Sequence, residues 1–406
     1  MLMAEPSQQV LLEAIKASLF GSTFSYPDDT DWDAVIKEAK SQAVMGLIGP
    51  VIPVQDKSSD QRTAYYIRLL YEQDKLLKML AEHNIPCVIL KGAAVAVYYP
   101  KPSLRTMGDV DFLVPRSQFD AAMKLMESNG YVYSHGKGDD GGLAFQSRHI
   151  GYFKNGIEFE LHHHFSSKGF NIDDILENAI QHREYKELCG FRFPVLPETE
   201  NGLVLLGHMN QHMLTDHLGL RQIIDWEMYI HAVRDSEKWE KEFAPIAKEI
   251  GLYKLAVNVT RMCGKHLGLP ETIGRNDSAK EEIADEMMEN LLTYGNFGRK
   301  QPSSSEDSGE RIRTVLGDIK SKGLFSYFQD NGQETWELCK KHPVLKPAAF
   351  LYGFFRFLIR GTTGILKTGK LKEQIKYVRQ KNRFDRDLGI RTKETGKSRQ
   401  NKKPSK

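Results

Sequence analysis

Apolar residues at helical spacing dominate the first part of the chain. Within residues 11–19 they recur every three to four residues, which predicts a helix. Asp31 precedes the next apolar stretch and is expected to cap a helix that starts near Ala34. A longer helix is predicted over residues 59–83, with large apolar side chains along its inner face. Residues 1–84 are therefore expected to form an N-terminal helical region.

After residue 84 the pattern changes to short apolar runs that alternate with helical segments. Residues 86–90 predict a buried strand, and residues 92–98 predict a short helix after it. Residues 109–114 predict a second strand, and residues 119–129 predict an amphipathic helix. The alternation indicates the start of a region that mixes helices with a sheet.

Three more strands are predicted at residues 143–146, 149–154 and 157–162. Asn155-Gly156 separates the last two and is a strong signal for a two-residue hairpin turn. The Gly- and Asp-rich stretch 135–142 is expected to be a loop. Residues 85–170 together are therefore expected to form the core that contains the sheet.

The rest of the chain is predicted to be helical, so the fold class is α+β, a small mixed β-sheet core embedded in mainly α-helical flanking regions. Residues 171–300 are expected to form a helical domain, with helix continuing from 171 to about 292. Residues 301–311 are a predicted linker, and residues 312–378 a C-terminal helical region. Residues 379–406 hold eleven Lys or Arg against three Asp or Glu, which predicts a basic, disordered tail.

The composition of the 406-residue chain is typical of a soluble globular protein, with 40% hydrophobic and 27% charged residues. The N-terminus lacks the pattern of a signal peptide. The most apolar later segment, residues 348–359, contains Arg356 and is too short to span a bilayer. Four cysteines without CxxC spacing favour reduced thiols. We therefore expect a cytoplasmic protein without a membrane span.

Asp109 and Asp111 are the strongest chemical signal in the chain. They lie two residues apart in a predicted strand, so their side chains share one face while Val110 and Phe112 point to the other. Two carboxylates on one half-buried face repel each other and resist loss of water. A divalent cation keeps both ionised, and Mg²⁺ prefers a few carboxylates together with substrate phosphate oxygens.

A third carboxylate is expected from the predicted strand at residues 157–162. Alternation places Glu158, Glu160 and His162 on the same face of this strand. If the strand neighbours the one with the two aspartates, Glu160 completes a three-carboxylate cluster, although Glu158 competes for this role. Such a cluster can hold two metal ions that bridge a triphosphate and activate an attacking hydroxyl.

Lys91 and Arg105 are natural partners for the phosphates of a nucleotide, and an arginine can bind them through two hydrogen bonds. Gly92 would let the backbone approach a phosphate closely at the start of the predicted short helix. The alternative for the two cations is a surface salt bridge.

These residues together suggest a family. The motifs Lys91-Gly92, Tyr98-Tyr99-Pro100, Arg105-x-x-Gly108-Asp109-x-Asp111 and Glu160-Leu161-His162 resemble those of bacterial nucleotidyltransferase-like proteins of the polymerase-β superfamily, in particular a helix-rich group. The resemblance covers roughly residues 30–300. It implies that Asp109, Asp111 and Glu160 are the catalytic, metal-binding triad, and that Lys91, Gly92, Arg105 and Gly108 bind the nucleotide.

Several other polar residues have two possible roles. His162 either has a functional role, as a base or a substrate contact, or is simply a polar residue beside the acids. Zinc binding by the run of histidines at 162–164 is disfavoured, because neighbouring strand residues face opposite ways. His208 and His212 share a helical face, a spacing that also suits a zinc pair, but a structural role or a supporting role with Asp225 is favoured over metal binding. Arg221 and Asp225 also share a face and are expected to form a helix pair, with lining of the nucleotide cleft as the alternative.

The predicted function is a metal-dependent transfer of a nucleoside monophosphate from an NTP to an acceptor hydroxyl, with release of pyrophosphate. Mg²⁺ or Mn²⁺ is the expected cofactor. The acceptor is open: a small molecule, a protein or an RNA. The alternatives are a nucleotide-sugar glycosyltransferase that uses Asp109 and Asp111 as its metal-binding DxD, and a non-catalytic nucleotide-sensing protein. Weak nucleic-acid contact by the basic tail is a further possibility.

Overall fold

A computed structural model gives the arrangement of the chain in two compact units. One unit comprises residues 1–300 with 388–390, and the other comprises residues 301–387 with 391–406. The structure describes the following ranges: 4–134, 149–165, 171–215, 218–233, 236–270, 281–296, 300, 324–336, 338–339, 342–356 and 371–390. The predicted loop at 135–142, the predicted strand at 143–146 and the predicted linker at 301–311 lie outside these ranges.

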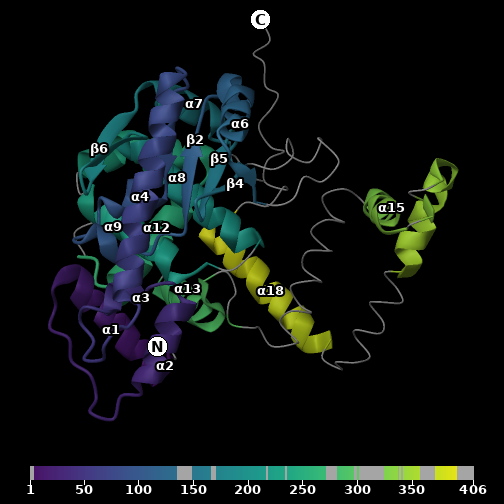
Figure 1. Cartoon of the computed structure of the whole chain (residues 1–406). Helices are drawn as coiled ribbons and strands as arrows, with labels where there is room; N and C mark the ends of the chain where they lie inside the picture. Colours follow the sequence, from purple (N-terminus) through teal and green to yellow (C-terminus); the bar gives the residue numbers. More distant parts are fainter. Residues whose placement is uncertain are drawn as a thin grey trace, which may run out of the picture. The chain divides into compact units, whose positions relative to one another are not determined.

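A seven-stranded mixed sheet forms the centre of the first unit, in the order β3-β4-β5-β2-β1-β7-β6 (Figure 1). Two neighbouring pairs are parallel, β2 with β5 and β1 with β7, and the remaining pairs are antiparallel. The strand bounds are β1 Val88–Leu90, β2 Asp109–Leu113, β3 Val132–Tyr133, β4 His149–Lys154, β5 Ile157–His162, β6 Glu184–Leu188 and β7 Phe191–Val195. This mixed sheet within helical surroundings confirms the predicted α+β fold class.

Helices precede, interrupt and follow the strands in sequence. In the first unit they are α1 Pro6–Phe20, α2 Trp32–Ser41, α3 Met45–Ile48, α4 Ser59–Glu82, α5 Gly92–Ala96, α6 Phe119–Ser128, α7 Asp173–Gln181, α8 Glu198–Thr215, α9 Leu220–Ala232, α10 Ser236–Lys238, α11 Ala244–Ile250, α12 Tyr253–His266 and α13 Glu281–Tyr294. The second unit contains α15 Leu324–Thr335 and most of α18 Leu371–Leu388. The Asp31 side chain accepts a hydrogen bond from the Ala34 N–H and so caps α2.

The two faces of the sheet differ in character. One face packs against α4 and α6 in a buried apolar cluster that includes Val110, Phe112 and Phe159 (Figure 1). The strand residues that alternate with these, Asp111 and Glu160 among them, point to the opposite face. The sheet thus separates an apolar core from a face that carries the acidic side chains.

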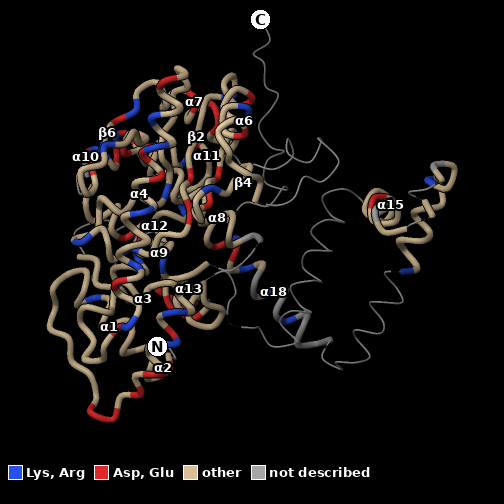
Figure 2. The backbone as a smooth tube through the Cα atoms, in the orientation of Figure 1, with Lys and Arg blue, Asp and Glu red and all other residues tan. Residues whose placement is uncertain are grey.

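Along the chain of the first unit, basic and acidic residues are interspersed (Figure 2).

The prediction of continuous helix over residues 171–292 is wrong at the hairpin of β6 and β7. This hairpin turns at Cys189-Gly190, which both have positive φ, 51° and 81°. Two features of the sequence explain why this hairpin was not predicted. The residues of β6 are mostly polar, and β7 contains Pro194, which argues against a strand unless it lies where no ladder hydrogen bond is needed.

The prediction of a disordered tail from residue 379 is wrong for residues 379–388. They form the second half of α18, an amphipathic helix rich in Lys and Arg. A strongly charged sequence can still be helical when its apolar residues fall on one face. Residues 391–406 lie outside the described ranges. No helix within the described ranges is both long enough and apolar enough to cross a membrane.

Glu227 on α9 gives a prediction about pH and stability. Its side chain is fully buried, and burial raises its pKa well above the usual range. The folded carboxyl therefore holds its proton more tightly than the unfolded chain does, so this group destabilises the fold as the pH rises above the usual pKa of a glutamate. Glu227→Gln should add at least about 1 kcal/mol at pH 7 and almost nothing at pH 4.

Urea unfolding of wild type and Glu227→Gln at pH 4, 5.5 and 7 measures this difference directly. A gain that grows with pH supports a neutral, buried carboxyl. A loss that grows with pH would mean that the carboxylate is ionised and paired in the folded protein.

Candidate active site

The parallel pairing of β2 with β5 brings the three predicted acids together. The register places Asp109 opposite Glu158 and Asp111 opposite Glu160. One ligand oxygen from each of Asp109, Asp111 and Glu160 lies within 4.8 Å of the others, a group to which Glu158 does not belong. These three residues are called the acidic cluster below. Of the two competing glutamates, the geometry favours Glu160.

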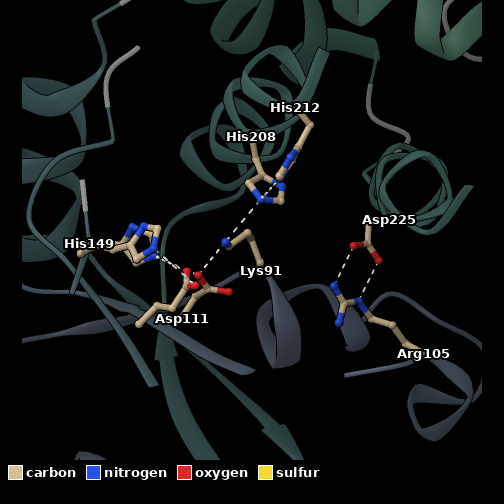
Figure 3. A network of polar contacts seen from close by, with 9 residues as sticks. Lys91, Arg105, Asp111, His149, His208, His212 and Asp225 are labelled. Carbon is tan, nitrogen blue, oxygen red and sulfur yellow. Dashed lines mark hydrogen bonds and ion pairs between the residues drawn. The ribbon is translucent and has the colours of Figure 1, made fainter. Parts of the chain in front are cut away.

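Two nitrogen groups contact the most buried acid of the cluster (Figure 3). Asp111, which is 2% exposed, accepts hydrogen bonds at one oxygen from Lys91 Nζ at 2.6 Å and from His162 Nε2 at 2.8 Å. His162 Nε2 also lies 3.5 Å from a Glu160 oxygen. The three carboxylates are therefore held together by neighbouring nitrogens that partly offset their repulsion.

The pKa values in the cluster follow from this arrangement. Burial, followed by repulsion from Asp111, raises the pKa of Asp109. Burial opposes ionisation of Glu160, but the hydrogen bond from His162 and the charge of Lys91 outweigh it and lower its pKa to about 2. Burial also opposes the charge of Lys91, yet the carboxylates raise its pKa. The acid with the least stabilised charge is thus Asp109.

Lys91 reaches the acids from a strained turn. It follows β1 directly and precedes α5, with φ 46° and ψ −129°, a conformation that residues other than glycine rarely adopt. Such a conformation costs about 1–3 kcal/mol and persists only when the surroundings enforce it. Here the ammonium group is fixed at its far end, by Asp111 and by His208 Nε2 at 3.5 Å.

A cavity of about 280 Å³ opens beside the cluster, between the sheet and the helices α8 and α9. The polar side chains that line it from these helices include His208, Gln211, His212, Arg221 and Gln222. His208 Nε2 lies 2.8 Å from His212 Nε2, and burial together with the charge of Lys91 lowers the pKa of His208 well below its usual range. The cavity therefore has carboxylates, imidazoles and cationic groups in its lining.

Arg105 lines the same cavity but has a protein partner. Its Nε and Nη2 donate to the two oxygens of Asp225, both at 2.7 Å, and Tyr99 Oη donates to Asp225 at 2.7 Å. Arg105 is 6% and Asp225 5% exposed. The predicted phosphate ligand is thus part of a buried ion pair that joins the strand region to α9. Arg221, one turn before Asp225, also lines the cavity.

Gly92 and Gly108, the other residues predicted to bind the nucleotide, have different surroundings. Gly92 lines the cavity, whereas the carbonyl of Gly108 accepts a hydrogen bond from Tyr65 at 2.6 Å. The run of histidines divides as strand alternation predicts. His162 faces the acids, His163 packs against Phe119, and the third histidine of the run pairs with an aspartate.

A comparison with known proteins identifies the family to which the chain belongs. Residues 28–268, more than half of the chain, match a family described as uncharacterised nucleotidyltransferases. The chain belongs to this nucleotidyltransferase family. No curated protein matches the chain. The match confirms the predicted resemblance to nucleotidyltransferases.

The matched range of this nucleotidyltransferase contains the whole candidate site. It includes the acidic cluster, Lys91, the Arg105–Asp225 pair and both cavity helices α8 and α9. The match therefore extends beyond the sheet into the helices that line the cavity.

One residue at the site was missed by the sequence reasoning. His149 on β4 lies beside Glu160, with Nε2 3.5 Å from Oε1. A signal for it was present, because a two-residue turn at Asn155-Gly156 fixes the hairpin register and pairs His149 with His162.

Proposed function

We propose that this nucleotidyltransferase moves a nucleoside monophosphate from an NTP to an acceptor hydroxyl. The acceptor oxygen bonds to the α-phosphorus, the bond from that phosphorus to the pyrophosphate breaks, and the hydroxyl proton leaves. The observation that carries the proposal is the meeting of three carboxylates at a cavity that also contains Lys91 and Arg221. Family membership supports nucleotidyl transfer over the glycosyltransferase alternative.

The donor set of the acidic cluster fits Mg²⁺ or Mn²⁺. Carboxylate oxygens are the preferred protein ligands of hard divalent ions, and ligand atoms within 4.8 Å of one another can reach a common ion. Asp109, Asp111 and Glu160 would hold the metal in this proposal. A bound ion would neutralise phosphate charge and make the acceptor hydroxyl easier to deprotonate.

The cations of the cavity are proposed to bind the triphosphate. Lys91 is near enough to the acids to contact a phosphate that approaches a metal there, and Gly92 leaves room beside it. Arg221 supplies a second positive charge from α9. Arg105 is proposed to act mainly by positioning α9 through Asp225, because its guanidinium already forms a two-point ion pair.

A matched pair of variants on one strand tests the proposal. Glu160→Gln should lower pyrophosphate release at least about 100-fold, because it removes a metal-binding charge worth a few kcal/mol. Glu158→Gln, two residues away on the same face, should change it less than about threefold. The assay supplies each of the four NTPs with Mg²⁺ or Mn²⁺, uses a cell lysate as the acceptor source, and follows the label from α-³²P NTP.

Label that moves to a product in wild type and Glu158→Gln, and not in Glu160→Gln, supports nucleotidyl transfer and shows the acceptor class by product size. Binding of Mg²⁺-NTP without any turnover would favour the nucleotide-sensing alternative. Equal loss in both glutamate variants would contradict the assignment of Glu160. We further propose a cytoplasmic location for the protein and weak nucleic-acid contact by its basic tail.

A further inference from the structure

We propose that His149, Glu160 and His162 form a second metal site, beside the acidic cluster, for a divalent transition-metal ion of the Zn²⁺ type. One ligand atom from each of these residues lies within 4.8 Å of the others. The set has two imidazoles and one carboxylate, whereas the acidic cluster has oxygen ligands alone. This inference goes beyond nucleotidyl transfer and rests on the hairpin geometry, not on that proposed function.

The distances within the set match a common ion. Nε2 of His149 lies 3.5 Å from Oε1 of Glu160, and Nε2 of His162 lies 3.5 Å from Oε2. Two ligands that each sit about 2.1 Å from a tetrahedral zinc ion are about 3.4 Å apart. Each imidazole nitrogen therefore has one Glu160 oxygen at this spacing, Oε1 for His149 and Oε2 for His162, and an ion would use one of the two.

The backbone holds these side chains in place. His149 and His162 are direct partners in the antiparallel hairpin of β4 and β5, so their side chains leave the same face. Their ring centroids lie 5.0 Å apart. Gly151 is the partner of Glu160, and the Ser134 side chain fills the space that a side chain at Gly151 would need. The strand register thus places the ligands before any ion arrives, and an ion bound at His162 Nε2 would replace the hydrogen bond from this nitrogen to Asp111.

The donor types separate the two sites chemically. Imidazole nitrogen suits Zn²⁺, Co²⁺ and related transition ions, while a set of oxygens alone suits Mg²⁺ and Mn²⁺. Three protein ligands leave a fourth tetrahedral position for water or a substrate oxygen, the pattern of reactive zinc sites. The His149 side chain is 41% exposed, so that position is reached from outside.

Cobalt is the probe for the proposed site, because Co²⁺ replaces Zn²⁺ and its visible absorption reports coordination by imidazole. Wild type should bind about one Co²⁺ with such a spectrum, and Zn²⁺ should displace it. His149→Ala and His149→Asn should each weaken Co²⁺ binding at least about 100-fold. His83→Ala, an exposed histidine outside the set, should bind Co²⁺ as wild type does.

Asp109→Asn separates the proposed site from the acidic cluster, since it removes an oxygen ligand that only the cluster uses. Co²⁺ binding that survives in Asp109→Asn and is lost in both His149 variants supports the site. Binding that survives in the His149 variants, or that Asp109→Asn abolishes, would overturn it, as would the absence of Co²⁺ and Zn²⁺ binding in wild type. X-ray absorption of the zinc-loaded wild type counts the imidazole ligands without any substitution.

Discussion

Asp109→Asn is expected to abolish nucleotidyl transfer while making the metal-free protein more stable. Asp109 is the acid whose pKa is raised, by burial and by repulsion from Asp111. A carboxylate of this kind destabilises the fold at pH 7, so a neutral amide of the same shape should relieve the strain. The same change removes a metal-binding charge, so turnover should fall at least about 10³-fold.

The sign of the pH dependence provides a check on the cause. A carboxyl with a raised pKa in the folded state destabilises the protein above its unfolded pKa and not below it. The gain in melting temperature from Asp109→Asn should therefore be present at pH 7 and disappear near pH 4. Mg²⁺ should raise the melting temperature of wild type more than that of the variant.

Melting curves at both pH values, with and without Mg²⁺, together with pyrophosphate release, measure these effects. Loss of activity together with a lower melting temperature at pH 7 would contradict this account. It would mean that Asp109 stabilises the metal-free fold, through contacts that outweigh its repulsion from Asp111.

Arg105→Ala is expected to have the largest effect on stability. Removing one partner of a buried ion pair leaves the other charge without compensation and typically costs about 3–5 kcal/mol. Asp225 would keep only the hydrogen bond from Tyr99 among the contacts described above. Urea unfolding should show this loss. Arg116→Ala, which breaks an exposed pair with Asp174, should cost about 1 kcal/mol or less.

The companion variant Arg221→Ala tests how the two arginines divide their roles. It should weaken Mg²⁺-NTP binding and cost less stability than Arg105→Ala, because Arg221 lies at the cavity wall whereas Arg105 forms the two-point ion pair with Asp225. Titration of both variants with Mg²⁺-NTP makes the comparison. If Arg105→Ala keeps its stability and loses NTP binding, the phosphate role predicted from sequence is the better one.

Local patterns predicted the strands that carry the site, because its residues lie in regular elements with clear signals. The Asp-Val-Asp strand has strict alternation, and Asn155-Gly156 fixes the hairpin next to it. Once β5 is taken as the neighbour of β2, side-chain alternation brings Glu160 to the face that carries Asp111. Short-range periodicity was sufficient for these parts of the fold.

Local patterns could not predict contacts between segments that are distant in the sequence. Asp225 lies one helical turn from Arg221, so sequence reasoning paired these two residues, yet Asp225 forms its two-point ion pair with Arg105. Nothing in helical spacing reports a partner 120 residues away. The β6–β7 hairpin was missed for a related reason, since an edge pair with polar residues and a proline lacks the usual strand composition.

The parallel pairing of β2 with β5 also sets an order of assembly. The β4–β5 hairpin closes over a two-residue turn and can form early, whereas β2 ends at Leu113 and β5 begins only at Ile157. We expect the hairpin to fix which face of β5 carries Glu160 before β2 docks. The charges of the site would then meet only at that docking step, after the apolar face of the sheet has gained enough contacts to hold them together.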